Sequence, residues 1–268
     1  MATHRLNVFR FHHLSELGVP HGMTRREPSL PSDGDVSFAT AGSPPEARLN
    51  RQRWWHAIGL DWRRTVCGRQ VHGARVALVS ECEAGRGADG PDTALPATDG
   101  LVTADPDLPL AVFCADCAPV LLYDPVHRVA AALHAGWRGT VAGIVLEAVN
   151  LLITKFGTDP AQLRAGIGPA IGPCCYEVGD EVIESWLSRQ LDREHRAVIR
   201  CDGRWHFDLW EANLLALELA GVPPANVELA GICTRCRSGE WFSHRAYQAG
   251  HIRAGRFAAV IAVPAGGG

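Results

Sequence analysis

Three residues of types that bind transition metals stand in short motifs containing glycine or proline. They are His72 in QVHG, Cys117 in ADCAP and His134 in HAGWRG. Two imidazoles and one thiolate would make a zinc site with an open fourth position, which is typical of catalytic zinc. Such a site can generate hydroxide near neutral pH. Judged by spacing alone, the histidines could also be hydrogen-bonded core residues, so both interpretations stay open.

Two CxxC motifs suggest a different metal chemistry. The pairs Cys114/Cys117 and Cys233/Cys236 together could supply four thiolates to zinc. More than a hundred residues separate the pairs, whereas zinc ribbons usually place them within about 20 residues. Residues three apart on a strand also point to opposite faces, so the first pair would not reach one metal. The sequence therefore favours buried free thiols over a four-cysteine site or a redox dithiol.

Charged and nucleophilic residues near these motifs add further candidates. Arg138 and the amides of a helix starting near Thr140 could bind a phosphate, although Arg138 could also be an ordinary surface residue. In GIGPAIGPCCYEVGDEV, Cys174 and Cys175 could be nucleophiles and Glu177 an acid or base. No neighbouring cation would lower a thiol pKa there, so the sequence favours a structural role.

A pocket-lining role is open to the pair His244 and Arg245 in FSHRA, which follow an aromatic residue. The pair alone does not identify a ligand.

Strands must bring these motifs together. They are predicted at 65–79, 101–103, 110–115, 120–123, 129–134, 227–233 and 257–263. The runs between 101 and 134 do not alternate cleanly, which is typical of strands covered on both faces. His134 would then lie where a strand passes into a helix.

Helices are predicted at about 140–156, at about 180–191 and from Asp208 to Gly221. Thr140 would cap the first helix, and Gly157 stands where a C′ glycine belongs. Asp208 with Glu211 forms an acidic variant of the capping box. The first fifty residues and segment 80–98 are rich in proline and glycine and are predicted to be loops.

Composition excludes several classes of protein. The 268 residues are 47% hydrophobic and 21% charged, which is typical of globular chains and not of disordered, fibrous or coiled-coil ones. A net charge of −3 provides no basic field for nucleic acid or membrane. The longest apolar stretch, 108–123, is broken by Asp116 and two prolines, so no membrane span is expected. Without a secretory signal in MATHRLNVFRFHH, we expect a cytoplasmic protein whose nine cysteines are free thiols or metal ligands.

Taken in order, these segments resemble the YfiH-like laccase-domain family, also known as polyphenol oxidases and as purine nucleoside phosphorylases. The segments are QVHG, TDG, ADCAPVLLYDP, VAALHAGWRGT, GPAIGPCCYEVG, DL…N at 208–213, CT…FSHR and a closing GR at 255–256. The likeness covers about residues 18–263, and the order and spacing of ADC-x-P and HAGWRG are highly specific.

The resemblance implies an α/β fold, namely a single-domain α/β/β/α sandwich of mixed sheets (CNF/YfiH-like) over residues 1–268. It places zinc on His72, Cys117 and His134, and copper is also possible because imidazole and thiolate suit it. The implied activity is phosphorolysis of adenosine, inosine, guanosine and methylthioadenosine, with adenosine deamination as a side activity. The implied partners are a purine nucleoside and phosphate, and the chain would be a monomer or homodimer.

Further roles follow from the same resemblance. Asp116 or Glu177 would act as the acid that hydrogen-bonds the leaving base. Substrate and phosphate would contact Arg26, Gln70, Arg138, His244 and Arg245. The family's Thr-Arg-x-Gly-Gly-Val-Ser appears here as MTRREPS, so Arg25 is an alternative to Arg26.

The sequence also departs from the family pattern. The Leu-Asn-x-Gly segment is not evident around residues 38–42, and His244 stands where Tyr is frequent. These departures leave the purine preference open.

Three rival functions belong to other classes. One is a copper oxidase of phenols, although the chain lacks the His-x-His and His-Cys-His clusters of a trinuclear copper site. Another, known in the family, is editing of peptidoglycan precursors that carry a misincorporated serine. The third is a non-catalytic interaction protein, in which the three metal ligands would be idle.

Overall fold

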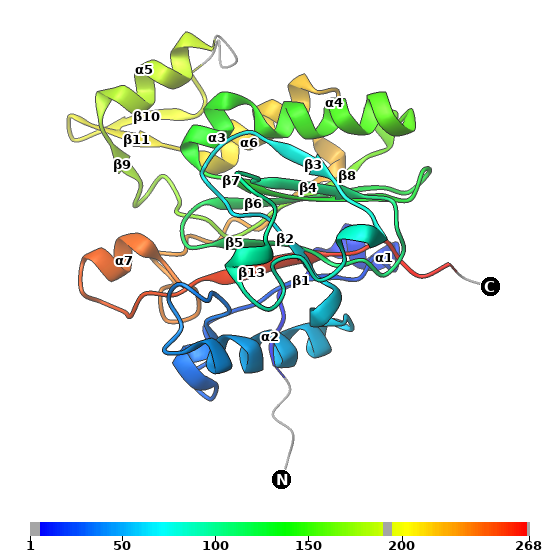
Figure 1. Cartoon of the computed structure of the whole chain (residues 1–268). Helices are drawn as coiled ribbons and strands as arrows, with labels where there is room; N and C mark the ends of the chain where they lie inside the picture. The colour runs from blue at the N-terminus through cyan, green and yellow to red at the C-terminus, as the bar shows by residue number, and fades with distance from the viewer. Residues whose placement is uncertain (1–5, 190–194, 267–268) are drawn as a thin grey trace.

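The computed structural model describes residues 6–189 and 195–266. Two β-sheets are stacked face to face, and helices cover the outer face of each (Figure 1). The six-stranded sheet has the order β12 (Val227–Leu229), β8 (Arg164–Ile167), β6 (Ala118–Asp124), β7 (Val129–Ala135), β4 (Gly100–Thr103) and β3 (Val76–Leu78). The four-stranded sheet has the order β1 (His21–Met23), β13 (Phe257–Ile261), β5 (Leu110–Cys114) and β2 (Val66–Cys67). Both sheets mix parallel and antiparallel pairs.

A third, smaller sheet contains β10 (Val198–Cys201), β11 (Arg204–Phe207) and β9 (Glu177–Val178) and lies next to α5 (Figure 1). The described helices are α1 (His12–Glu16), α2 (Pro44–Ile58), α3 (Trp137–Ala142), α4 (Ile144–Phe156), α5 (Asp180–Ser188), α6 (Leu209–Leu219) and α7 (His244–Gln248). None of these helices is long and apolar enough to cross a bilayer.

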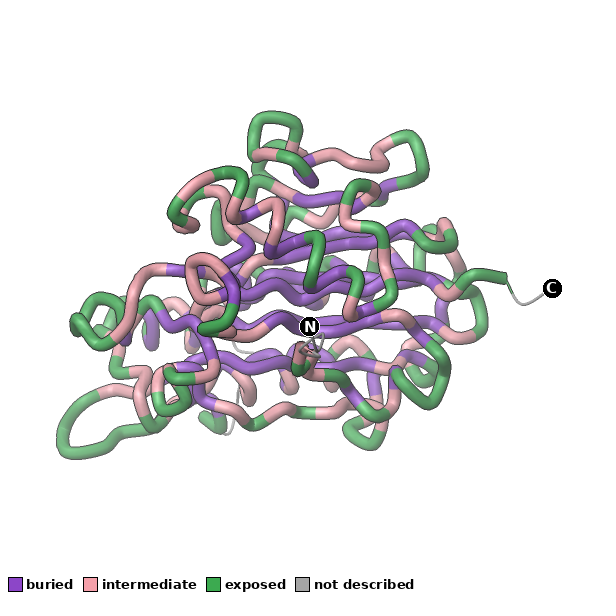
Figure 2. Tube along the Cα trace, turned by 90° about the horizontal axis from the view of Figure 1, so that it is seen from below, coloured by how far each residue is buried: buried purple, intermediate pink, exposed green. Residues whose placement is uncertain are grey.

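Strand β6 illustrates how the four layers are held together. Every residue of β6 is buried, and successive side chains point to opposite faces of the sheet. Val120 and Leu122 pack in the core shared with α4 and α6. Leu121 and Tyr123 pack in the core between the two sheets. Figure 2 shows the buried strands running through the middle of the molecule, with exposed loops at their ends. The expected α/β sandwich of mixed sheets is therefore confirmed.

All the predicted strands are present, with shorter or shifted bounds in several cases. The predicted stretch 65–79 is strand only at β2 and β3, and the QVHG motif forms the loop between them.

Two local predictions were wrong. The segment expected to be a loop around the two prolines forms α2, because Pro44 and Pro45 occupy its first turn, where a missing N–H costs nothing. The helix predicted at 140–156 is divided by Gly143, whose left-handed φ of 90° separates α3 from α4. Thr140 therefore lies inside α3 and caps nothing.

Other helix ends agree with the sequence. Gly157 ends α4 with a φ of 73°, and the Asp208 carboxylate accepts hydrogen bonds from the amides of Trp210 and Glu211. Helix α5 begins at Asp180 as predicted and ends at Ser188. The predicted continuation to residue 191 extends beyond the described residues.

One edge of the six-stranded sheet brings distant segments together. Strand β7 is antiparallel to both β6 and β4, so the end of β7 lies beside the beginnings of these two neighbours. His134 pairs with Pro119 across β7 and β6, which brings it close to Cys117. Strand β3 runs parallel to β4, so the loop that carries His72 reaches the same edge.

Candidate metal centre and active site

The three predicted metal ligands meet at this edge. Each of His72, Cys117 and His134 offers one ligand atom, and these atoms lie within 4.8 Å of one another. The two imidazole rings have centroids 4.9 Å apart and planes inclined at 69°. His134 is buried, whereas His72 is exposed, so the group borders solvent on one side. We call these residues the three-ligand site.

Asp99 braces two of the three ligands. One of its carboxylate oxygens accepts hydrogen bonds from Nδ1 of His134 and the amide of His72, both at 2.9 Å. The other oxygen accepts from the amides of Val71 and Gly73, both at 3.0 Å. Nδ1 of His134 is thus engaged and Nε2 is left to bind a metal, as the carboxylate–histidine arrangement of zinc sites requires. Asp99 belongs to the TDG segment, and the sequence analysis missed its role.

The electrostatics of Asp99 agree with this role. Burial alone would raise the pKa of its carboxyl group, but the hydrogen bonds from His134, Val71 and Gly73 outweigh burial and lower that pKa. Asp99 is therefore ionised at neutral pH. A carboxylate at this position both orients the imidazole of His134 and makes it a better ligand.

Local backbone conformation also shapes the site. His72 adopts a left-handed φ of 62°, which is uncommon for a residue with a side chain. Gly136 follows His134 closely, and a Cβ atom there would lie 2.9 Å from Sγ of Cys117 and 3.2 Å from Cδ2 of His72. The HAGWRG motif therefore needs glycine at this position so that the backbone can pass beneath the ligands.

The cysteine and the buried histidine change each other's protonation. Burial would raise the pKa of the Cys117 thiol, but His134 and His72 lower it to about 6. Burial would lower the pKa of His134, but Cys117 and Asp99 raise it to about 9. Without a cation, the pair is consequently a thiolate beside an imidazolium at neutral pH. Thiolate is the form of cysteine that binds metals.

Charged, polar and aromatic residues lie beside Cys117. We call Asp116, Tyr176, Thr234 and Arg245 the wall of the site. Asp116 has a left-handed φ of 86°, and its carboxylate accepts hydrogen bonds from the Thr234 hydroxyl and the Arg245 amide, both at 2.7 Å. The Arg245 guanidinium lies 5.6 Å from the centre of the Tyr176 ring. Burial, together with the negative charge of Cys117, raises the pKa of Tyr176, so its phenol stays protonated. The sequence analysis assigned no role to Tyr176.

Two guanidinium groups near this wall can receive an anion. Arg138 is exposed and stacks on the Trp137 ring at 4.3 Å. Two guanidinium nitrogens of Arg245 donate hydrogen bonds to the carbonyl oxygen of Glu177, both at 3.3 Å. Within residues 6–189 and 195–266, no carboxylate forms a salt bridge with either guanidinium.

The structure gives other partners to two predicted site residues, Glu177 and Arg26. The Glu177 carboxylate forms a salt bridge with Arg204 at 2.9 Å on the surface. Arg26 donates to Asp33 and to the carbonyl of Ser238, both at 2.8 Å.

Gln70 and His244 also occupy defined positions. Gln70 exchanges two 2.8 Å hydrogen bonds with the backbone of Phe113, which anchors the loop that carries His72. His244 begins α7 and is exposed, with its ring 6.1 Å from that of Tyr247.

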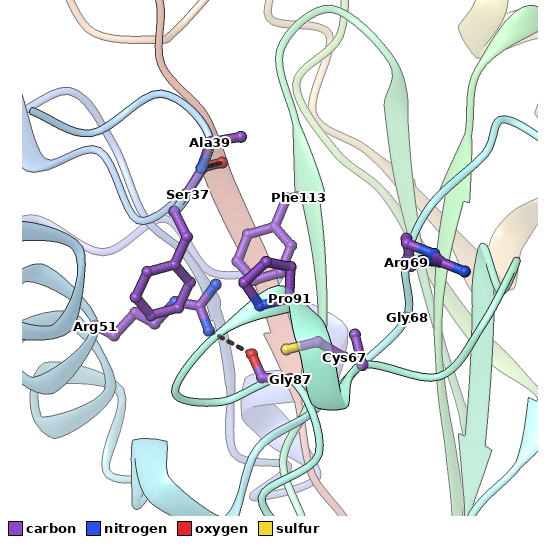
Figure 3. Close-up of a pocket in the computed structure, with 11 residues that line it drawn as sticks. Ser37, Ala39, Arg51, Cys67, Gly68, Arg69, Gly87, Pro91 and Phe113 are labelled. Atoms are coloured by element: carbon purple, nitrogen blue, oxygen red, sulfur yellow. Dashed lines mark hydrogen bonds between the residues drawn. The ribbon is translucent and has the colours of Figure 1, made fainter. Parts of the chain in front are cut away.

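A cavity of about 170 Å³ lies next to the beginning of the same loop, as Figure 3 shows. The buried Arg51 lines this cavity, and its guanidinium carbon lies 4.4 Å from the centre of the Phe38 ring and 4.6 Å from that of Phe113. The guanidinium also donates a hydrogen bond to the carbonyl of Gly87. None of the three metal ligands lines this cavity. It is therefore a separate feature that shares Phe113 with the anchor of Gln70.

The two CxxC motifs do not combine. Cys114 is fully buried in the core between the sheets, and Cys117 belongs to the three-ligand site. Cys233 and Cys236 instead lie beside Cys174 and Cys175. The expectation of buried free thiols thus holds for Cys114 and fails for Cys236, which is exposed. All nine cysteines have free thiols and none forms a disulfide.

The same sandwich occurs in a solved structure, that of the hypothetical protein YfiH from Bacillus licheniformis. The two structures superpose with a TM-score of 0.89 and 33% sequence identity over 98% of each chain. The chain belongs to the family described as multi-copper polyphenol oxidoreductase laccase, whose model matches residues 22–264. The predicted resemblance to the YfiH-like laccase-domain family is therefore confirmed.

Two relatives carry enzyme names. The chain is 40% identical over 198 residues to "Purine nucleoside phosphorylase YlmD" from Geobacillus stearothermophilus, covering 73% of this chain and 72% of the relative. It is 36% identical over 189 residues to "Adenosine deaminase RL5" from an unknown prokaryotic organism, covering 70% and 72%.

Proposed function

We propose that this chain is a zinc-dependent purine nucleoside phosphorylase with adenosine deaminase side activity. The observation that carries the proposal is the three-ligand site itself, braced by Asp99 and near two guanidinium groups, Arg138 and Arg245, that form no salt bridge with a carboxylate among the described residues. The names of two relatives support the substrate class. Adenosine, inosine, guanosine and methylthioadenosine are the substrates that we expect.

The residues present fit a zinc ion. Two imidazoles and one thiolate leave a fourth position free, as in catalytic zinc sites, and Gly136 leaves the space that a Cβ atom would fill. A zinc ion held there would supply Lewis acidity and an activated water. Copper would suit the same donors, so the metal identity is part of the test.

The chain's own residues would bind and orient the reactants. Arg138 and Arg245 would hold phosphate by charge-assisted hydrogen bonds. In phosphorolysis a phosphate oxygen forms a bond to C1′ of the ribose while the bond between C1′ and N9 of the purine breaks. The electron pair of the broken bond leaves with the purine. In deamination water replaces the amino group at C6 and ammonia leaves.

The leaving purine needs a hydrogen-bond donor. The sequence analysis suggested Asp116 or Glu177 for this role. Both Asp116 oxygens already accept hydrogen bonds and the Glu177 carboxylate is paired with Arg204. We therefore assign Asp116 to positioning the wall, on which the Tyr176 phenol is a protonated donor.

The decisive experiment incubates the purified protein with adenosine, with and without phosphate, and separates the products by chromatography. Adenine formed only with phosphate would support a phosphorylase, and inosine formed without phosphate would support a deaminase. Cys117→Ala should abolish both products and the metal of the three-ligand site, whereas Cys82→Ser, which alters an exposed cysteine, should change neither. Turnover by a Cys117→Ala protein that holds no metal in the three-ligand site would refute the scheme.

The same preparation tests the rivals. Copper content with oxygen uptake on phenols would replace the proposal with an oxidase. Absence of product from all four purine nucleosides would favour editing of peptidoglycan precursors.

A further inference from the structure

Four cysteine thiols gather at the surface beside the wall described above. They are Cys174, Cys175, Cys233 and Cys236, and we call them the thiol cluster. Their sulfur atoms lie within 4.8 Å of one another. Sγ of Cys236 is 3.6 Å from Sγ of Cys174 and 3.5 Å from Sγ of Cys175. Two short segments that lie far apart in sequence thus each contribute two thiols.

Burial in the core does not explain this convergence. Cys174 and Cys236 are exposed, Cys175 is half-buried, and Cys233 alone among the four is buried. A free cysteine usually behaves as a small apolar core residue, as Cys114 does here. Thiols are also weak hydrogen-bond donors and acceptors. Contacts between the thiols themselves would therefore not hold four of them together at the surface.

The spacing of the sulfur atoms matches a shared cation. Zinc–sulfur bonds of roughly 2.3 Å in a tetrahedron place the sulfurs about 3.8 Å apart. A disulfide would bring two sulfurs to roughly 2.05 Å. The observed separations of 3.5 and 3.6 Å are close to the first distance and far from the second. Tetrahedral coordination by four thiolates is typical of structural zinc.

Backbone hydrogen bonds fix both segments. The Thr234 amide donates to Ala170 at 2.9 Å, so the segment with Cys233 pairs with the one that precedes Cys174. The Tyr176 amide donates to Gly172 at 3.0 Å and closes the turn that carries the adjacent cysteines. The Gly172 amide points at Sγ of Cys233 at 3.3 Å. An amide donor at sulfur favours the thiolate form that a metal requires.

We propose that the thiol cluster binds one zinc ion as a structural site, additional to the cation of the three-ligand site. Binding displaces the thiol protons, and four thiolates around one zinc ion carry two net negative charges. Arg235 lies between the two cysteines of its CxxC motif and supplies one compensating positive charge, whereas Arg237, which directly follows the motif, is paired with Glu240.

The zinc ion would tie together the two segments that form the wall of the active site. Cys175 directly precedes Tyr176, and Cys233 directly precedes Thr234, whose hydroxyl donates to Asp116. Of the thiol cluster, Cys175 packs against the sandwich core and Cys233 is buried, whereas Cys174 and Cys236 are exposed. Loss of this zinc should therefore loosen the wall without unfolding the sheets. The inference does not depend on which reaction the enzyme catalyses.

Alkylation of the wild-type chain, loaded with zinc alone under reducing conditions, tests the proposal without any variant. Iodoacetamide followed by peptide mass mapping reports each thiol separately. Cys82 and Cys201, which are exposed and outside the cluster, serve as internal controls. Cys174 and Cys236 should react at least about tenfold more slowly than these controls, and the difference should vanish after chelation. Equal rates in the zinc-loaded protein would overturn the proposal.

Metal counting provides an independent measurement. The double variant Cys174→Ser/Cys236→Ser should lose one zinc ion per chain relative to wild type, and Cys82→Ser/Cys201→Ser should lose none. Cys117→Ala should lose the other zinc ion and keep the protection of Cys174 and Cys236. Unchanged zinc content in the first double variant, or cluster cysteines recovered as disulfides from the reduced protein, would refute the site. A protected cluster in a chain without purine turnover would leave this site standing and remove the proposed function.

Discussion

At the scale of a single residue, the side chain of Asp99 connects three segments of the chain. Its carboxylate holds the loop 71–73 by three amides and orients His134 through Nδ1. A carboxylate in this position is worth about 10–100-fold in metal affinity or activity in other metal sites. Asp99 stands in the TDG segment of the sequence. A histidine that binds a metal usually donates its other ring N–H to a carboxylate, and this general rule could have identified Asp99.

Asp99→Asn should therefore lower metal affinity by about 10–100-fold. Asparagine can accept with its single carbonyl oxygen from only one of the two pairs of donors, its Nδ2 group cannot accept from the other pair, and it lacks the negative charge that supports His134. Competition with a calibrated chelator measures the affinity. Asp92→Asn, which alters an exposed acid, is the matched control. Wild-type affinity in Asp99→Asn would show that the charge plays no part in holding the cation.

Arg138 is the second residue whose role can be separated from the others. If it binds phosphate, Arg138→Ala should raise the KM for phosphate by about 10–100-fold, the equivalent of one charged hydrogen bond of roughly 1.5–3 kcal/mol. Deamination of adenosine, which needs no phosphate, should change little. Arg53→Ala, on the exposed side of α2, is the control. Equal losses in both reactions would instead indicate a structural role.

At the scale of elements, Asp124 joins the β6–β7 hairpin to the end of α4. Its buried carboxylate accepts hydrogen bonds from the Thr158 hydroxyl at 2.6 Å, from Nδ1 of His127 at 2.9 Å, and from two turn amides. Burial would raise the pKa of Asp124, but the hydrogen bonds from Thr158 and His127 outweigh it and lower the pKa.

The lowered pKa of Asp124 predicts a dependence of stability on pH. A depressed folded-state pKa contributes stability above the unfolded value of about 3.9 and loses it as pH falls through the folded value. Asp124→Ala should cost about 3 kcal/mol of unfolding free energy at pH 7, and less below about pH 4. Denaturant titrations at several pH values, with Asp92→Ala as control, measure the difference. A difference that is constant down to pH 3 would contradict the linkage.

At the scale of the whole molecule, the stacking of two sheets fixes the site. Leu121 lies fully buried in the central strand β6 and faces the second sheet. Because the interior is close-packed, Leu121→Ala should lower the unfolding free energy by about 2–5 kcal/mol. Val126→Ala, in the exposed turn after β6, should change it by less than about 0.5 kcal/mol. Equal effects of the two substitutions in denaturant titrations would contradict this account of the core.

Many features of this molecule can be predicted from its amino-acid sequence. Apolar runs bounded by turn residues predicted most strands of the two main sheets, because a buried strand must be continuous and apolar, but they did not predict β1, β8 or the strands of the small sheet. Gly157 and Asp208 marked helix ends through local conformation and local hydrogen bonding. The motifs around His72, Cys117 and His134 predicted three candidate metal ligands by residue type and by resemblance to a family, and the structure brings these residues together. All of these signals are short in range or carried by single motifs.

Which cysteines lie close together becomes evident from the folded chain and not from the sequence. The two CxxC motifs raised the possibility of one four-cysteine site, and their separation along the chain argued against it without showing where either motif lies. Strand β5 buries Cys114 between the sheets, and a parallel bridge at Ala170 and Cys233 sets Cys236 beside Cys174. The same is true of Asp99, whose partners come from two other segments. Side-chain contacts between distant segments depend on strand order and register, and no local pattern in the sequence encodes either.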